Sequence, residues 1–194
     1  MFLDAICFAL SGFFMKISDE AMDEKNNILL AIITGIICVI ATILVSINSG
    51  DAACIFISIL VGTALAQKVD SINHIISAIL LIVILLLIGI PQFSYITLII
   101  CIIAAFIDEK GNDIADEKEE NKEEYGLIDK FFKYRYTMKI VVLILSLLGL
   151  ITNLLNYSFL TGYFFEPLTF IYFYLFDLSY EFAGLTFNGI YDLF

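Results

Sequence analysis

The sequence has no tryptophan, two prolines, one histidine and only ten basic residues among 194. The shortage of Lys and Arg leaves a net charge of −11, which excludes the basic face that a nucleic-acid partner would require. The four cysteines lie inside apolar runs without CxxC or Cys/His spacing, so they predict neither a zinc site nor a disulfide framework. The sequence also lacks a nucleotide-binding glycine motif and an EF-hand loop.

Charged residues are also scarce, at 16%, whereas 61% of the residues are hydrophobic and the mean hydropathy is +0.97. Soluble domains are nearer half apolar and a quarter charged. A soluble core of this length cannot hide so much apolar surface, because much of the chain must face the solvent. The composition therefore predicts a membrane protein, and it excludes a disordered chain.

Charge-free apolar runs mark the segments that can cross a membrane. Residues 28–47 form a run of 20 residues without a charge, long enough to span a hydrocarbon core of about 30 Å as a helix. Other runs cover 75–90, 140–165 and 167–176, and shorter ones cover 5–15, 52–66 and 93–107. With the shorter runs counted, we expect an all-α polytopic membrane protein with about seven transmembrane helices, some of them short or re-entrant.

The Lys and Arg residues set the expected orientation, because cytoplasmic loops carry the Lys/Arg excess. If every run crosses, all ten basic residues lie on one side, in the segments 16–27, 67–71 and 108–139. No Lys or Arg falls on the opposite side, which receives residues 1–4, 48–51, 91–92 and 156–167. We therefore expect a cell-membrane protein with its N-terminus outside and its C-terminus in the cytoplasm.

An internal similarity suggests that the chain, a single membrane domain over 1–194, contains repeats. A shift of 47 residues aligns Asp4-Ala5-x-Cys7-x-x-x-Ser11 with Asp51-Ala52-x-Cys54-x-x-x-Ser58, and Asp23-x-x-Asn26 with Asp70-x-x-Asn73. We expect like-oriented helical hairpins over about 4–47, 51–90 and 93–157, followed by an aromatic C-terminal helix over 158–194 and interrupted by an acidic cytoplasmic loop over 108–136. Packing such hairpins together would gather their acidic cytoplasmic turns around one axis.

Acidic residues at these turns are the candidate metal ligands. Most are followed four residues later by a second possible ligand, and on a helix that spacing places both side chains on one face. Mg²⁺ prefers oxygen ligands and bridges one or two carboxylates to substrate phosphates, whose charge Lys68 and Lys110 are expected to neutralise. The predicted Mg²⁺ ligands are Asp19, Asp23, Asp70, Glu109 and Asp113.

Three residues are candidates for catalysis: Asp70, His74 and Asp177. His74 follows Asp70 by four residues and can act as a general base or a ligand, or it is a polar residue at the membrane interface. Asp177 lies near the middle of the bilayer if the last helix starts at Pro167, and at the cytoplasmic interface if it starts near Tyr163. An ionisable group at mid-depth is usually functional.

The D-x-x-x-D pair Asp19–Asp23, with partial echoes at Asp70 and Glu109, resembles the aspartate motifs of the intramembrane UbiA-type prenyltransferases. In that family, paired aspartate motifs hold Mg²⁺-diphosphate, so the resemblance implies the same role for these carboxylates. It covers only these few residues. The family's fuller N-D-x-x-D motif is missing, and this chain is shorter and has fewer spans.

Three functions fit these features. The first is a Mg²⁺-dependent enzyme acting on a lipid- or isoprenoid-linked phosphate at the cytoplasmic face. The second is a small cation or solute transporter or channel, which would use Asp177. The third is a non-catalytic subunit, embedded among membrane lipids, whose arm over 108–130 docks a soluble partner. Ordinary helix caps and solvated ion pairs also explain the acidic turns, and the sequence leaves the oligomeric state open.

Overall fold

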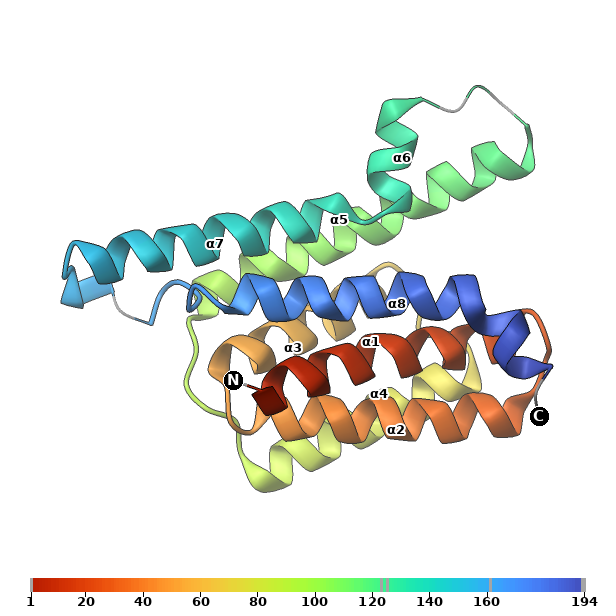
Figure 1. The fold of residues 1–194 in the computed structure, drawn as a ribbon, viewed down its shortest axis with the longest axis horizontal. Helices are drawn as coiled ribbons and strands as arrows, with labels where there is room; N and C mark the ends of the chain where they lie inside the picture. Colours follow the sequence, from red (N-terminus) through yellow and green to blue (C-terminus); the bar gives the residue numbers. More distant parts are fainter. Residues whose placement is uncertain (1, 123, 125, 161, 193–194) are drawn as a thin grey trace. The chain divides into compact units, whose positions relative to one another are not determined.

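The computed structural model describes residues 2–122, 124, 126–160 and 162–192, and within these ranges the chain is helical and contains no strand (Figure 1). The expected all-α class is confirmed. The eight α-helices of the described ranges are α1 (Phe2–Asp23), α2 (Ile28–Ser46), α3 (Gly50–Leu65), α4 (Ile72–Ile88), α5 (Tyr95–Glu120), α6 (Leu127–Lys133), α7 (Tyr136–Leu154) and α8 (Thr169–Tyr191). A short 3₁₀ helix, η1 (Ser158–Leu160), follows α7.

The chain divides into two compact units. Unit 1 comprises Met1–Ala53, Val69–Pro91 and Ile171–Phe194, and therefore contains α1, α2, α4 and nearly all of α8. Unit 2 comprises Cys54–Lys68 and Gln92–Phe170, with most of α3 together with α5, α6 and α7. This division separates α3 from α4, whereas the predicted repeat over 51–90 placed them in one hairpin.

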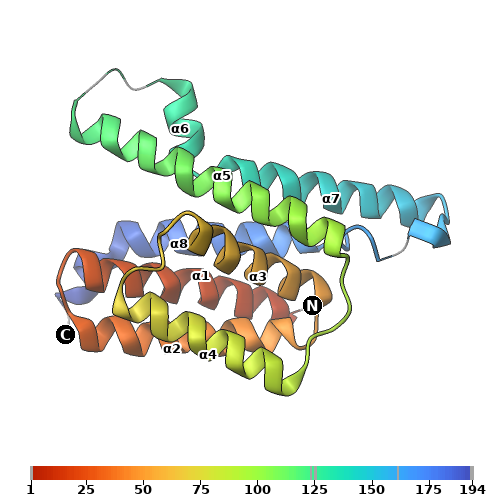
Figure 2. The ribbon, with the colours of Figure 1, turned by 180° about the vertical axis from the view of Figure 1, so that it is seen from behind.

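In unit 1, α1 lies between α2 and α8, and α4 packs against α2 (Figures 1 and 2). The turn from α1 to α2 uses Asn26 in a left-handed conformation with φ of 48°, which asparagine tolerates. Asn27 then caps α2 by accepting a hydrogen bond from the backbone N–H of Leu30 (3.1 Å). Small side chains let the helices approach, and the core comprises Ile17, Ala21, Ala31, Ala183 and Phe187.

In unit 2, α5 runs beside α7, and α6 packs on the polar end of α5 (Figures 1 and 2). The segment 108–136, expected as an acidic cytoplasmic loop that is solvated or partly helical, is largely helical because α5 continues to Glu120 and α6 follows. This extension contains several Glu and Lys residues, which favour helix. Gly111 allows the close contact with α6, since a Cβ there would lie 2.2 Å from the Phe132 ring.

Asp108 joins α5 to the start of α7. Its buried carboxylate accepts hydrogen bonds from the backbone N–H groups of Thr137 (2.9 Å) and Met138 (2.7 Å). These N–H groups belong to the first turn of α7, where a helix has no internal acceptors. The preceding residue, Arg135, has no capping side chain and a left-handed φ of 49°. Asp108 therefore serves α7 as an N-cap supplied from another helix.

Several helices expose aliphatic side chains on their outer face and bury polar side chains on their inner face. On α2, for example, the exposed side chains include Ile33, Ile37 and Ile40, whereas Thr34 and Thr42 are buried. Two helices of the described ranges, α2 and α7, are long and apolar enough to cross a membrane, and the apolar helices α3 and α4 are shorter.

Replacing Asp108 by alanine is expected to destabilise the protein by roughly 2–3 kcal/mol, because two N–H groups of α7 lose their acceptor. The measurement is thermal unfolding of the purified protein in detergent. Asp116→Ala, an exposed carboxylate on the same helix, is the control and should change little. Equal effects of the two substitutions would show that Asp108 does not cap α7.

Candidate functional site

Asp19 and His74 form the most defined contact between predicted site residues. Asp19 lies near the end of α1 and His74 in the first turn of α4, and Nε2 of the imidazole lies 2.8 Å from Oδ1 of the carboxylate. The Tyr180 hydroxyl of α8 donates to the other carboxylate oxygen, Oδ2, at 3.2 Å. The carboxylate therefore fixes the orientation of the imidazole plane. The pair is partly open to solvent, with the His74 side chain 33% exposed.

A buried polar layer holds α4 against α1 next to this pair. Nδ2 of Asn73 donates to the Ser18 hydroxyl (2.9 Å), which in turn donates to the carbonyl of Ala31 on α2 (2.8 Å). Asn73 is 1% exposed, and its Oδ1 has no hydrogen-bond partner among the described residues. The close packing of this layer requires a glycine at position 35, since a Cβ on Gly35 would lie 2.7 Å from the Ser77 hydroxyl. The layer sets the position of the residue after Asn73, which is His74.

Two further acidic residues lie at the same end of unit 1. Burial raises the pKa of Asp23, the negative charge of Asp19 raises it further, and Asp70 adds a smaller contribution in the same direction. The positive charges of His74 and Lys16 oppose these effects without cancelling them. The predicted turn residues Asp19, Asp23, Asp70 and His74 are thus close enough to interact electrostatically.

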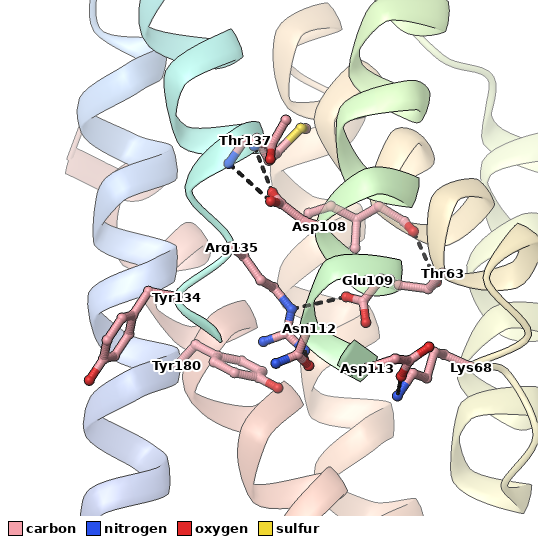
Figure 3. Close-up of polar contacts among 12 residues, drawn as sticks. Thr63, Lys68, Asp108, Glu109, Asn112, Asp113, Tyr134, Arg135, Thr137 and Tyr180 are labelled. Carbon is pink, nitrogen blue, oxygen red and sulfur yellow. Dashed lines mark hydrogen bonds and ion pairs between the residues drawn. The ribbon is translucent and has the colours of Figure 1, made fainter. Parts of the chain in front are cut away.

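In unit 2, Lys68 and Lys110 both pair with Asp113, and Figure 3 shows Lys68 beside this carboxylate. Lys68 follows α3 and pairs with Oδ1 of the carboxylate, whereas Lys110 of α5 lies 3.4 Å from Oδ2 and also donates to the carbonyl of Ala66 (2.8 Å). Burial alone would raise the pKa of Asp113. The hydrogen bond and charge of Lys68, with those of Lys110, outweigh that effect and lower it.

Glu109 pairs with Arg135 and not with a lysine. Its carboxylate accepts a hydrogen bond from Nε of Arg135 at 3.0 Å, and Nη2 of Arg135 donates to Oδ1 of Asn112 at 3.3 Å (Figure 3). The Glu109 side chain is only 12% exposed, so the pair holds the α6–α7 junction on α5. Glu109 and Asp113 are therefore each neutralised by their own basic partners.

The predicted Mg²⁺ ligands do not form a site made of protein groups alone. No three His, Cys, Asp or Glu side chains in the described part of the chain lie close enough together to hold a metal ion. Glu109 and Asp113 are committed to basic side chains, and Asp19 is committed to His74. The residues that fit a metal arriving with a phosphate are Asp23 and Asp70, which have no ion-pair partner among the described residues.

Asp177 lies on α8, which begins at Thr169 rather than at Pro167. The backbone N–H of Thr169 donates to the carbonyl of Glu166 (2.9 Å), so Pro167 occupies a turn before the helix. Asp177 is then about 12 Å along the helix axis, and it is partly buried.

No family model, curated protein or solved structure matches the chain.

The sequence did not identify Tyr180 and Arg135 as site residues. Tyr180 is separated from Asp19 by 161 positions, and nothing in its surrounding sequence links the two residues. Arg135 lies in the aromatic and basic stretch before α7, a composition typical of a membrane-surface anchor. The signal that could have indicated its role is the acidic residue Glu109 at the corresponding end of α5, the helix that pairs with α7.

Replacing Asn73 by alanine is expected to lower the free energy of unfolding by roughly 1–3 kcal/mol, because the buried Ser18 hydroxyl loses its hydrogen-bond donor. Thermal unfolding in detergent measures this loss. Asn153→Ala removes an exposed asparagine from α7 and is the matched control, with little expected change. The same unfolding temperature for both variants would mean that the polar layer does not hold α4 in place.

Proposed function

We propose that the chain is a polytopic membrane protein with about seven transmembrane helices and its basic residues on the cytoplasmic side. The support is the aliphatic outer surface of helices such as α2 and α4, together with the length and hydropathy of α2 and α7. Seven helices of the described ranges have 16 residues or more, and each overlaps one of the apolar runs: α1, α2, α3, α4, α5, α7 and α8.

We propose further that the protein is a Mg²⁺-dependent enzyme acting on a lipid- or isoprenoid-linked phosphate at the cytoplasmic face. One observation carries this function: Asp19, His74 and Tyr180 meet from three helices of unit 1, with Asp23 and Asp70 nearby. His74, oriented by Asp19, is the general acid or base. The surrounding apolar helix surfaces suit a substrate with a lipid tail.

Mg²⁺ enters this proposal together with the substrate phosphate. Mg²⁺ is commonly held by one or two carboxylates and by phosphate oxygens rather than by an all-protein cage. Asp23 and Asp70 supply such carboxylates. Burial raises the pKa of Asp23 most, and the negative charge of Asp19, which a bound cation would offset, raises it further. Bound there, the ion would neutralise phosphate charge. In the chain itself, Asp19 holds the imidazole and Tyr180 holds Asp19.

A cation or solute transporter is the second candidate. It is favoured by buried hydroxyl groups within unit 1, including the Ser11–Thr42 hydrogen bond of 3.1 Å between α1 and α2. Ser46 and the Ser18–Asn73 contact add further polar groups inside the helices. Asp177 would be its principal ionisable residue, and a flux in liposomes lost in Asp177→Asn would favour this function.

A subunit that docks a soluble partner is the third candidate. The observation that favours it is the tip of α6, where Leu127 is 85% and Ile128 is 72% exposed. The predicted arm over 108–130 includes the first four residues of this helix. Asp129, beside the two aliphatic residues, pairs with Lys118 at 2.7 Å. These two adjacent aliphatic side chains would offer such a partner an apolar contact on an otherwise polar arm.

Pyrophosphate with Mg²⁺ is expected to stabilise the purified protein against thermal unfolding, by about 2.7 kcal/mol at a ligand concentration a hundredfold above Kd. The stabilisation should be lost in Asp70→Asn and in Asp23→Asn, because each removes a carboxylate. Asp116→Asn is the control and should retain it. No stabilisation, or an equal one in Asp70→Asn, rules out the proposed enzyme.

A further inference from the structure

Two ammonium groups share one carboxylate in unit 2. Each oxygen of Asp113 faces a different lysine, Lys68 at Oδ1 and Lys110 at Oδ2, and the cluster carries a net charge of +1. All three side chains are open to solvent, with exposed fractions of 41% for Lys68, 44% for Lys110 and 34% for Asp113. The arrangement is therefore accessible to a dissolved or membrane-bound anion.

The backbone fixes both lysines in place. After α3 the chain turns at Gln67, which has a left-handed φ of 66°, and the N–H of Lys68 bonds to the carbonyl of Thr63 at 3.0 Å. The Lys110 ammonium is anchored by the buried Ala66, whose carbonyl accepts its hydrogen bond at 2.8 Å. The two ammonium groups repel each other, and the carboxylate that both of them face offsets this repulsion.

We propose that Lys68 and Lys110 form a binding site for a phosphate group, and that Asp113 is a resident anion that the phosphate displaces. A phosphate offers several oxygens and up to two negative charges, so it can satisfy both ammonium groups at once, as the carboxylate does with one charge. The inference goes beyond the proposed function, since it concerns unit 2 alone and requires neither Mg²⁺ nor His74.

Exposed aliphatic residues adjoin the cluster in the sequence. Leu65 is 59% exposed and precedes Lys68 by three residues, and Ile107 is 40% exposed and precedes Lys110 by three residues. The phosphate can therefore come from a lipid head group or from free phosphate, and the recognising chemistry is the same. This site gives Asp113 a role opposite to that of a metal ligand, because removing its charge strengthens binding of the ligand.

Titration of inorganic phosphate into the full chain in uncharged detergent, with EDTA present, tests the proposal. Calorimetry is expected to show binding that is about tenfold tighter in Asp113→Asn and about tenfold weaker in Lys68→Gln and in Lys110→Gln. Asp116→Asn, an exposed acid on the same helix, is the control and should bind like the unaltered chain. Phosphate binding in Asp113→Asn that is equal or weaker would overturn the proposal.

A second measurement uses the unaltered chain and does not depend on a variant that folds. Phosphate should protect Lys68 and Lys110 from acetylation, as read by mass spectrometry, and should leave the exposed Lys122 and Lys130 reactive. The same readout in nanodiscs of phosphatidylcholine, with or without phosphatidic acid, distinguishes the sources. If only phosphatidic acid or only free phosphate protects the two lysines from acetylation, that result identifies the ligand. If neither protects them, the proposed site is contradicted.

Discussion

The structure depends on the pairing of polar groups inside helices whose outer faces are aliphatic. An unpaired polar group is costly in apolar surroundings, so each buried hydroxyl or amide needs a partner on its own or a neighbouring helix. In unit 1 the contact among Ser18, Asn73 and the Ala31 carbonyl meets this need across three helices. It also fixes the first turn of α4, and this brings His74 to Asp19.

At the helix ends, the role of each carboxylate is decided by the partner that it finds. Asp113 faces two lysines and Glu109 faces an arginine, whereas Asp108 faces two backbone N–H groups of α7. Burial is the main cause of the raised pKa of Asp23, and the negative charge of the neighbouring Asp19 raises it further. Acidic residues that look equivalent in the sequence therefore divide into ion pairs, a helix cap and a group suited to receiving a cation.

Local features of the fold could be predicted from the sequence, and long-range pairings could not. Hydropathy and charge located the long helices, and the aligned serines Ser11 and Ser58 each donate to the carbonyl of a cysteine four residues earlier, at 2.8 and 2.6 Å. Spacing on one helix could not show that Asp19 pairs with His74 rather than with Asp23, because that choice depends on how α4 packs. The partners of Asp113 and Glu109 likewise depend on α3 and on the α6–α7 junction.

Accessibility of single introduced cysteines tests most directly whether these helices cross a membrane with the basic residues on one side. The native cysteines are buried, so an impermeant maleimide added to intact cells should report only the introduced thiols. We expect labelling of Gln92→Cys in intact cells, and of Glu24→Cys only after permeabilisation. Both native residues are exposed and lie outside the helices, and the positive-inside rule puts the Lys-containing segment of Glu24, but not that of Gln92, in the cytoplasm. Labelling of both variants in intact cells, or of Glu24→Cys alone, would contradict this expectation.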